Sequence, residues 1–430
     1  MASLVEIGSV VSEPWRAPAT LRVALAGCGA VGSAFLRELV GRRATLADRH
    51  GVEIVLTRVL VRDVSLERAA PFDRTLLTDS VDEFLDTDAD VLVEAIGGLD
   101  PARRIAESAL ARGRELVTAN KELLAAHGSA LTALAWRSRT ALRYDAAVGG
   151  GVPVLRLLDD ALGAGTPTSV RGILNGTTNF VLTRLEEGAS LDSALRAARA
   201  AGFAEADASR DLDGRDAAAK LALVAWAAFG VAPEAVRVRR VSLLPDPARY
   251  VRLADRLERS VRQVAECALV NGELVSWVEP ALVERGSALA RTRDEQNRVE
   301  VHSGWSAPLC ASGPGAGGVP TATAMLSDLL GSRGRTRRPV STRVAVIDTR
   351  RSAWAIEARG APALLHRLVP GSGFVHTDAS SSCAWCIVEA ASAASAAEVG
   401  DMLHALEREG AEPIAVRFDG GSAIGAGACT

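Results

Sequence analysis

Short apolar runs alternate with helix-like stretches through the first third of the chain. The apolar runs begin at Leu21, Val52, Asp90 and Leu116, and helical patterns cover residues 33–40 and 101–112. Runs of this length that alternate with helices are typical of a parallel sheet with helices on both faces. After a short flexible arm (residues 1–20), the pattern therefore predicts an α/β fold that begins with a Rossmann-type nucleotide-binding domain over residues 21–147.

The pattern changes after Leu142, where strand-like and helix-like pieces mix without strict alternation. We expect an α+β domain for substrate binding and dimerisation over residues 148–312, and a segment over 313–332 that returns to the first domain. An arginine-rich linker follows at 333–340. Residues 341–420 show the order strand, strand, helix, strand, strand, helix, strand, which predicts a small ferredoxin-like module before a tail at 421–430.

Composition narrows the classes of partner. The 430 residues contain 49 Lys+Arg and 52 Asp+Glu, a net charge of −3, which argues against nucleic acid or an anionic membrane as the main partner. No apolar run reaches transmembrane length, and the first 20 residues lack the pattern of a secretory signal. Six scattered cysteines fit reduced thiols. We therefore expect a cytoplasmic protein of two or three domains.

A GxGxxG motif follows the first apolar run and precedes a helical pattern. Gly27 makes the tight turn, Gly29 lets backbone N–H groups approach a pyrophosphate, and Gly32 allows close packing of helix on strand. This context predicts a dinucleotide site. Arg62 follows the second strand and favours NADP, whereas the adjacent Asp63 would favour NAD, so the preference for NADP is a narrow one.

The chain contains only two lysines, Lys121 and Lys220, among 47 arginines. A guanidinium stays protonated at any working pH, whereas burial can tune an ammonium to give and take a proton. A chain that uses arginine almost wherever a positive charge suffices has kept lysine at two positions. We interpret these two as the best candidates for chemistry, with chance retention as the alternative. Lys121 is predicted at the carboxyl end of a strand, where ligands bind in such folds.

The stretch 202–220 begins as an acidic loop and ends as a helix. Its acidic side chains are Glu205, Asp207, Asp211, Asp213 and Asp216. Asp213 is predicted to cap the helix, and Asp216 lies four residues before Lys220, so these two share a helix face and can meet. The alternative is a solvated loop followed by a surface ion pair.

Three further segments carry polar or glycine-rich patterns. Gly149–Gly151 can turn carbonyl oxygens inward, which suits a monovalent cation, or can act as a plain hinge. Asn175–Asn179 opens a helix with hydroxyls and N–H groups that can bind a carboxylate, or that serve capping alone. Gly313–Pro320 is a glycine turn that either closes over phosphates or returns the chain to the first domain.

Together, in this order and at these spacings, the motifs resemble homoserine dehydrogenase. The resemblance covers residues 21–330 and is most specific at 202–220, 118–121 and 171–180; Gly313–Pro320 also matches. It implies an NAD(P)H-dependent interconversion of L-aspartate 4-semialdehyde and L-homoserine, in the threonine and methionine branch of amino-acid biosynthesis. It also implies a homo-oligomer, either a dimer or a tetramer.

The resemblance also implies roles for individual residues. The catalytic set is Lys220, Lys121 and Asp216, and the substrate-binding set is Glu205, Asp211, Gly176 and Thr177. The cofactor-binding set is Gly27, Gly29, Ala30, Val31, Gly32, Arg62, Ile96, Gly97, Lys121 and Gly315. A monovalent cation such as sodium is implied at Asp145, Val148, Gly150 and Val152, held largely through backbone oxygens. The chemistry agrees, because an amino aldehyde needs an anion for its ammonium, donors for its carboxylate and a general acid for the oxyanion.

The chain departs from the family pattern at three places. Asp145 stands where Glu is usual, Phe203 where Tyr is often found, and Arg359-Gly-Ala-Pro where a regulatory ACT domain has Asp-x-Pro-Gly. The departures bear on the cation, on one hydroxyl contact and on binding of an amino-acid effector. Two alternatives follow. One is a same-fold NADPH-dependent reductase of a different amino aldehyde, and the other is a non-catalytic NADP-binding regulatory protein.

Overall fold

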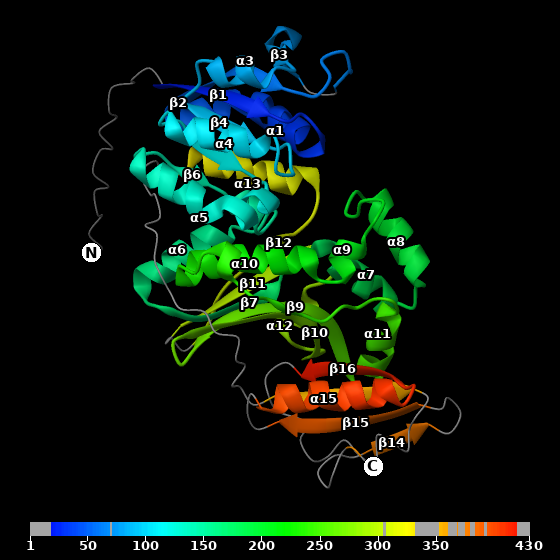
Figure 1. Cartoon of the computed structure of the whole chain (residues 1–430). Helices are drawn as coiled ribbons and strands as arrows, with labels where there is room; N and C mark the ends of the chain where they lie inside the picture. Colours follow the sequence, from blue (N-terminus) through cyan, green and yellow to red (C-terminus); the bar gives the residue numbers. More distant parts are fainter. Residues whose placement is uncertain are drawn as a thin grey trace, which may run out of the picture.

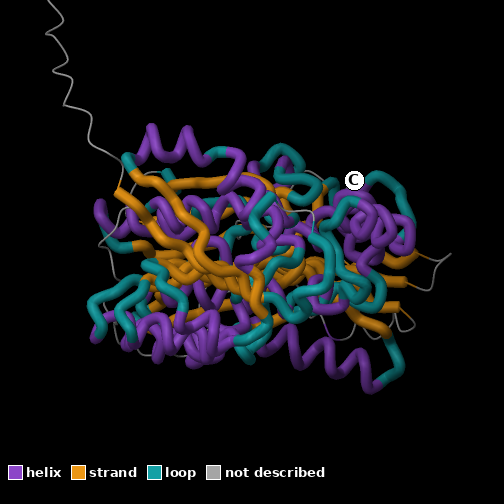
Figure 2. The backbone as a smooth tube through the Cα atoms, turned by 90° about the horizontal axis from the view of Figure 1, so that it is seen from above, coloured by secondary structure: helices purple, strands orange, loops and turns teal. Residues whose placement is uncertain are grey.

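The computed structural model describes residues 19–68, 71–303 and 307–331 and, beyond them, residues 352–359, 368, 375–378, 383–390 and 394–418. Figure 1 shows three regions one above another: an N-terminal domain in blue and cyan, a middle domain in green, and a C-terminal module in orange and red. Seen from above in Figure 2, the strands occupy a central band with helices on both sides.

The N-terminal domain is built on a parallel six-stranded sheet in the order β3-β2-β1-β4-β5-β6. The strands are β1 (Ala19–Ala26), β2 (Val52–Leu60), β3 (Leu77–Thr78), β4 (Val91–Glu94), β5 (Glu115–Thr118) and β6 (Leu142–Arg143). The helical elements are α1 (Ala30–Gly41), α2 (Arg43–His50), η1 (Arg74–Leu76), α3 (Val81–Asp86), α4 (Ala102–Ala111), α5 (Lys121–Arg137) and η2 (Asp145–Ala147).

Helices cover both faces of this sheet. Because successive strand side chains point to opposite faces, Val23 and Leu25 of β1 pack against α1 and α13 (Gly318–Leu330), whereas Ala24 and Ala26 pack on the side of α3, α4 and α5. Helix α13, drawn in yellow in Figure 1, thus joins a domain whose other elements come early in the chain. The parallel sheet with two covered faces confirms the predicted fold class.

The middle domain holds strands of a second sheet, in the order β12-β11-β7-β9-β10, with β8 beside β10. The strands are β7 (Pro167–Ile173), β8 (Arg239–Arg240), β9 (Arg259–Val270), β10 (Glu273–Glu284), β11 (Gln296–Ser303) and β12 (Leu309–Pro314). The helical elements are α6 (Val154–Ala164), α7 (Gly176–Glu186), α8 (Leu191–Ala200), α9 (Ser209–Leu212), α10 (Arg215–Phe229), η3 (Pro233–Ala235), α11 (Pro247–Arg256) and α12 (Ala288–Arg291). Helix α10 packs on this sheet through buried residues such as Leu221 and Val224.

The C-terminal module extends the same sheet. Its described elements are β13 (Ser352–Arg359), β14 (Val375–Asp378), β15 (Cys383–Ala390), α15 (Ala394–Arg408) and β16 (Glu412–Phe418). Strand β16 pairs with β10 at Ala281↔Arg417 and Leu282↔Phe418, so the sheet continues from one region into the other. The first predicted strand, from residue 342, lies outside the described residues.

Two local predictions next to the candidate site are wrong in detail. Strand β5 ends at Thr118 and Lys121 is the first residue of α5, because the Asn120 side chain accepts the N–H of Leu123 and caps the helix there. Helix α10 is preceded by Gly214 in the left-handed region (φ +78°) rather than by Asp213 as its cap. The Asp213 carboxylate instead accepts the N–H of Arg215 at 2.9 Å.

Candidate active site

The two lysines of the chain meet on one carboxylate. Lys220 and Asp216 lie one turn apart on α10, with the Lys220 Nζ 2.8 Å from Asp216 Oδ2. Lys121, at the start of α5 in the N-terminal domain, brings its Nζ to 3.1 Å from Asp216 Oδ1. Lys220 Nζ also donates to the carbonyl oxygen of Leu174 at 3.0 Å. We call Lys121, Asp216 and Lys220 the relay cluster.

Burial and charge act against each other in the relay cluster. Side-chain exposure is 11% for Asp216, 13% for Lys220 and 33% for Lys121. Burial alone would raise the pKa of the Asp216 carboxyl, but the adjacent Lys220 and Lys121 ammonium groups outweigh it and lower that pKa. Burial would likewise lower the pKa of Lys121, and the charge of Asp216 reverses the shift and raises it. At neutral pH the cluster thus keeps the Asp216 carboxylate ionised and in contact with a protonated Lys121.

Asn175 joins a second carboxylate to this cluster. Its Nδ2 donates to Asp216 Oδ2 at 2.8 Å and to Asp211 Oδ1 at 2.7 Å, while its Oδ1 accepts the N–H of Thr178 and caps α7. Burial raises the pKa of Asp211, and the hydrogen bond from Asn175 opposes that shift. The first N–H groups of α7, on Gly176 and Thr177, lie beyond the helix's own hydrogen-bond ladder, so they can bind an anion beside the cluster.

The loop that precedes α9 is held by backbone contacts. The buried Thr177 hydroxyl donates to the Phe203 carbonyl oxygen at 2.5 Å, and the Phe203 ring packs edge-on against Phe180 at 5.4 Å between centroids. The Thr177 hydroxyl is therefore engaged, and its N–H is the group available to a ligand. Glu205 lies on the same loop with an exposed side chain that makes no hydrogen bond or ion pair within the described part of the chain.

A cavity of about 760 Å³ lies at the carboxyl ends of β1, β2 and β4. Of the predicted cofactor-binding residues, those lining it are Gly27, Gly29, Arg62, Ile96 and Gly97. Within the described residues, no hydrogen bond or ion pair engages the Arg62 guanidinium, whereas Arg68 donates to the carbonyl oxygens of Leu66 and Asp63. Asp63 also lines this cavity, and its Oδ1 accepts from the N–H and hydroxyl of Ser65.

The other predicted cofactor residues lie outside the lining of that cavity. Ala30, Val31 and Gly32 form the start of α1, where a Cβ on Gly32 would stand 2.0 Å from the Gly27 carbonyl oxygen. Lys121 belongs to the relay cluster. Gly315 lies where the domains meet, since a Cβ there would stand 2.1 Å from the Asn297 side chain and a Cβ on Gly150 would stand 2.8 Å from the Gly315 carbonyl oxygen.

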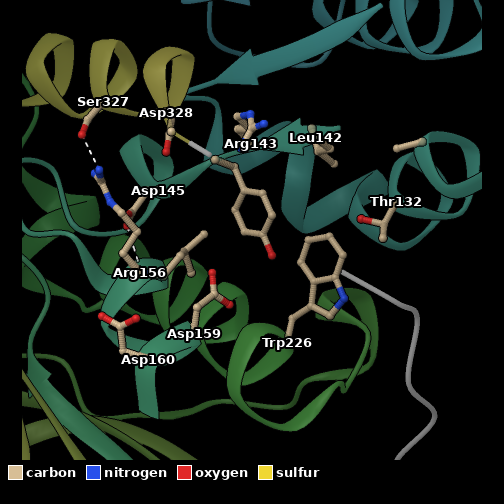
Figure 3. A pocket seen from close by; sticks show the side chains of 14 residues that line it. Thr132, Leu142, Arg143, Asp145, Arg156, Asp159, Asp160, Trp226, Ser327 and Asp328 are labelled. Carbon is tan, nitrogen blue, oxygen red and sulfur yellow. Dashed lines mark hydrogen bonds and ion pairs between the residues drawn. The ribbon is translucent and has the colours of Figure 1, made fainter. Parts of the chain in front are cut away.

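The predicted cation loop borders a second cavity of about 280 Å³, drawn in Figure 3. The Asp145 carboxylate, 2% exposed, accepts the N–H of Leu155 at 2.9 Å and lies 3.4 Å from Arg156 Nε. Asp328 of α13 accepts the N–H of Ala146, and Arg156 also donates to Ser327. We call Asp145, Asp328 and Arg156 the hinge cluster, because the N-terminal domain, α6 and α13 meet there.

Burial dominates the electrostatics of the hinge cluster. Burial raises the pKa of Asp145 above its ordinary value, although the hydrogen bond from the Leu155 N–H and the charge of Arg156 act to lower it. Burial together with the charge of Asp145 raises the pKa of Asp328 to about 7. Among the described residues, no three His, Cys, Asp or Glu side chains are grouped to hold a metal ion, so any cation here would depend on backbone oxygens.

Two family models match the chain in succession. Residues 27–145 match the NAD binding domain of homoserine dehydrogenase, and residues 153–330 match homoserine dehydrogenase itself. The chain belongs to the homoserine dehydrogenase family. It is accordingly an NAD(P)-dependent oxidoreductase acting on a CH–OH group, and the predicted interconversion of L-aspartate 4-semialdehyde and L-homoserine is confirmed, with a small molecule as substrate.

Similar proteins support the assignment over most of the length. The homoserine dehydrogenase of Mycobacterium leprae is 39% identical, with 73% of this chain and 74% of that protein covered. The Bacillus subtilis enzyme is 34% identical, with 72% of each covered. The crystal structure of a homoserine dehydrogenase from Thiobacillus denitrificans superposes with a TM-score of 0.81 at 27% identity, covering 93% of this chain and 98% of that one.

The structural match reaches into the C-terminal module, since 93% coverage cannot be reached by residues 1–330 alone. The comparisons do not favour the two alternatives, a reductase of another amino aldehyde and a silent NADP-binding protein. In the part of the chain that the structure describes, no helix combines the length and the apolar character needed to cross a membrane.

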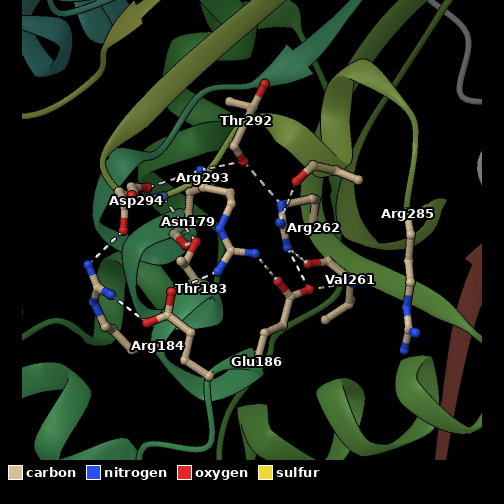
Figure 4. A network of polar contacts seen from close by, with 12 residues as sticks. Asn179, Thr183, Arg184, Glu186, Val261, Arg262, Arg285, Thr292, Arg293 and Asp294 are labelled. Atoms are coloured by element: carbon tan, nitrogen blue, oxygen red, sulfur yellow. Dashed lines mark hydrogen bonds and ion pairs between the residues drawn. The ribbon is translucent and has the colours of Figure 1, made fainter.

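Residues from 231–310, a region in which the sequence indicates no chemistry, hold helix α7 in place. Figure 4 shows Arg262, 0% exposed, bound to Glu186 and to the carbonyl oxygens of Val261, Ala290 and Thr292. The Asn179 Nδ2 group shares its two N–H bonds among three carbonyl oxygens in the loop that follows α12. These belong to Thr292, Asp294 and Gln296.

That loop lies against the start of α7. A Cβ on Gly176 would stand 2.5 Å from the Glu295 carbonyl oxygen, which also accepts the N–H of Gly315 at 2.8 Å. The Asn175–Asn179 motif is the signal that could have pointed to Asn179. Arg262 gives no such signal, because arginines are common in this chain and nothing local marks one as buried.

Proposed function

We propose that Lys220 is the proton donor of the reaction and that Asp216 holds it and Lys121 in place. The observation that carries the proposal is the convergence of the only two lysines of the chain on one buried carboxylate, Asp216. The nicotinamide, when bound, supplies the hydride. As hydride reaches the carbonyl carbon of the semialdehyde, the C=O π pair moves to oxygen, and Lys220 transfers a proton to that oxygen to give the alcohol.

The ammonium and carboxylate groups of the substrate are each assigned to protein groups of complementary charge. Asp211 lies beside the relay cluster and would receive the substrate ammonium, with Glu205 approaching from its exposed loop. The Gly176 and Thr177 N–H groups at the start of α7 would bind the α-carboxylate, helped by the helix dipole. Lys121 extends from α5 of the N-terminal domain to Asp216 of the middle domain. It would therefore stand on the nicotinamide side of the substrate.

NADP is the proposed cofactor, with Arg62 as the residue that receives the 2′-phosphate. Arg62 and Asp63 both line the cavity at the end of β2, but Asp63 Oδ1 is engaged by Ser65, whereas no hydrogen bond or ion pair within the described residues engages the Arg62 guanidinium. The test is NADPH oxidation with L-aspartate 4-semialdehyde, repeated with NADH. We expect turnover with both and a preference for NADPH. Arg62→Ala should lower kcat/KM for NADPH about tenfold and leave the NADH value within about twofold. Equal losses with both cofactors would contradict the role of Arg62.

The predicted cation loop is proposed to hold a monovalent cation such as sodium. Its carbonyl oxygens belong to Asp145, Val148, Gly150 and Val152, and Gly150 takes a positive φ of +64° that lets the backbone turn tightly. The fit is electrostatic as well, because Asp145 and Asp328 are two buried carboxylates whose pKa values stay raised despite the charges of Arg156 and Arg143. A cation there would join the two domains and balance charge at a distance from the reacting atoms.

The remaining predictions belong to the same proposal. They are a dimer or tetramer, an amino-acid effector acting through the C-terminal module, the domain boundaries given above, and a cytoplasmic location. The continuous pairing of β16 with β10 supports a mechanical link between the module and the middle domain. Size-exclusion chromatography with light scattering, with and without threonine, would test the first two.

A further inference from the structure

Glu94 is a buried carboxylate whose partners are all neutral. It is the last residue of β4 and is 0% exposed. Its Oε1 accepts the backbone N–H groups of Ile96 at 2.8 Å and Gly97 at 3.1 Å, and its Oε2 accepts the Thr118 hydroxyl at 2.5 Å. Among the described residues no cation pairs with it. A buried carboxylate without a counter-ion is costly, so it is satisfied by these neutral donors and by Asn120 Nδ2, which lies 3.5 Å from Oε1.

One arm of this network leads to Lys121. Thr118 Oγ1, besides donating to Glu94, accepts the N–H of Asn120 at 3.0 Å. The Asn120 side chain caps α5 through the N–H of Leu123, and its Nδ2 donates to the Gly98 carbonyl oxygen at 2.7 Å. Lys121 is the next residue. The direction in which its side chain leaves the helix is therefore set by Asn120 and, through Thr118, by Glu94.

The other arm leads to the cofactor cavity, because Ile96 and Gly97 line it. Gly97 has a φ of +79°, and the two N–H groups fixed by Glu94 hold this glycine turn in that conformation. We infer that Glu94 is a positioning residue that fixes the cofactor-binding turn and the first turn of α5 as one rigid unit. The turn that binds the cofactor, which supplies the hydride, and Lys121 are thereby held in a fixed position relative to each other.

This inference rests on the proposed role of the relay cluster. Hydride and proton transfer each need their atoms aligned, and a displacement of about 1 Å can cost about 10² in rate. If Glu94 served the fold alone, a neutral group of the same shape would cost less to bury at the same place. A carboxylate has enough lone pairs to accept from the turn and from Thr118 together, which a glutamine amide does not match.

The chain offers a matched control for the Thr118 arm. Thr78 ends β3, the edge strand on the other side of the same sheet; it is 3% exposed, donates to Glu83 Oε2 at 2.6 Å and accepts the N–H of Ser80 at 3.1 Å. This is the same pattern as at Thr118, but it leads away from the relay cluster. Thr118→Val and Thr78→Val therefore remove the same kind of hydroxyl from the same domain, and only the first should affect proton transfer.

The experiment measures kcat, KM and the pH profile of kcat in the full-length enzyme, with NADPH affinity from fluorescence titration. We expect Thr118→Val to lower kcat about tenfold with NADPH affinity within about twofold. The basic limb of the kcat pH profile of Thr118→Val should move to lower pH. The reason is that Lys121 would lie farther from Asp216, the carboxylate that raises its pKa. Glu94→Gln should lower kcat similarly and also weaken NADPH binding, Thr118→Ser should restore kcat, and Thr78→Val should leave kcat and its profile unchanged.

Other outcomes decide against the inference in separable ways. Wild-type kcat and profile in Thr118→Val, while Lys121→Ala and Lys220→Ala are inactive, would overturn the role of Glu94 and leave the proposed function intact. Equal losses in Thr118→Val and Thr78→Val would also overturn it, since general destabilisation would then explain both. Full activity of Lys121→Ala and Lys220→Ala would instead refute the proposed function. If Thr118→Val fails to fold by circular dichroism, the Thr118→Ser and Glu94→Gln pair gives the same readouts.

Discussion

The relay cluster and the hinge cluster both lie where the N-terminal domain meets the middle domain, and the pKa values of their carboxylates are shifted in opposite directions. In the relay cluster one carboxylate, Asp216, lies between two ammonium groups at 2.8 and 3.1 Å. In the hinge cluster Arg156 lies 3.4 Å from Asp145, and the charges of Arg156 and Arg143 act on Asp328 without outweighing its burial. Burial is similar in the two places, so the difference comes from the two ammonium groups that contact Asp216 directly.

That difference determines what each cluster can do. Because two ammonium groups contact Asp216, its pKa is lowered despite burial, and their positive charge is available to an oxyanion that forms during reduction. Because burial and the charge of Asp145 outweigh the charges of Arg156 and Arg143, the pKa of Asp328 is raised to about 7, and a proton or a metal ion would stabilise this carboxylate. The same domain junction thus holds one place suited to catalysis and one suited to cation-dependent joining of domains.

Loss of Lys220 should have the largest effect on this comparison. Lys220→Ala is expected to lower kcat about 10³-fold, because general acid catalysis contributes about 10²–10⁴. NADPH affinity, measured by fluorescence titration, should stay within about twofold because Lys220 is not among the residues that line the cofactor cavity. Lys220→Arg is the control, since it keeps the charge but not a proton that can be released, and it should remain slow. Unchanged kcat in Lys220→Ala would remove the acid assignment.

Neutralising the shared carboxylate should have a smaller effect and a distinct signature. Asp216→Asn is expected to lower kcat about 10²-fold, because both lysines lose their common anchor. The negative charge of Asp216 raises the pKa of Lys121, so its removal lowers that pKa and moves the basic limb of the pH profile to lower pH. Stopped-flow NADPH oxidation across the pH range would measure this. A basic limb that stays in place would mean that Lys121 does not control it.

The sequence predicted the relay cluster for physical reasons. Asp216 and Lys220 are four residues apart on a helix, a local spacing that survives folding. Lys121 was predicted near them because the carboxyl ends of parallel strands share one edge. The prediction erred on its exact place, at the first turn of α5, because the cap at Asn120 was not recognised. Glu205 was expected with the others, and its side chain is exposed on the loop before α9.

The hinge cluster was predicted only in part. The glycine loop and Asp145 are visible in the sequence, but Asp328 reaches Ala146 across 182 positions, and no local pattern announces such a pair. Arg262 was missed for the same reason, since its partners come from two distant segments, Glu186 in α7 and residues 290–292 at the end of α12. Contacts set by periodicity can be read from sequence, whereas contacts between distant loops depend on how the domains pack.

The smallest effect, and the sharpest contrast between the clusters, should come from sodium. At constant ionic strength, replacing choline chloride by sodium chloride is expected to stabilise the enzyme by about 1.4 kcal/mol at about ten times the Kd. This corresponds to a rise in Tm of roughly 3 °C by differential scanning calorimetry. Asp328→Asn should reduce the rise, because it removes one of the two buried carboxylates that attract the cation.

Two matched variants separate specific binding from a general salt effect. Asp160→Asn neutralises an exposed carboxylate on the rim of the same cavity and should keep the full sodium response. Asp216→Asn should keep it too, because Asp216 pairs with two ammonium groups and is not part of the proposed cation site. A sodium response lost equally in Asp160→Asn and Asp328→Asn would mean that diffuse surface charge attracts the ion. Its loss in Asp216→Asn would mean that the two clusters do not act separately, and the contrast between them would fail.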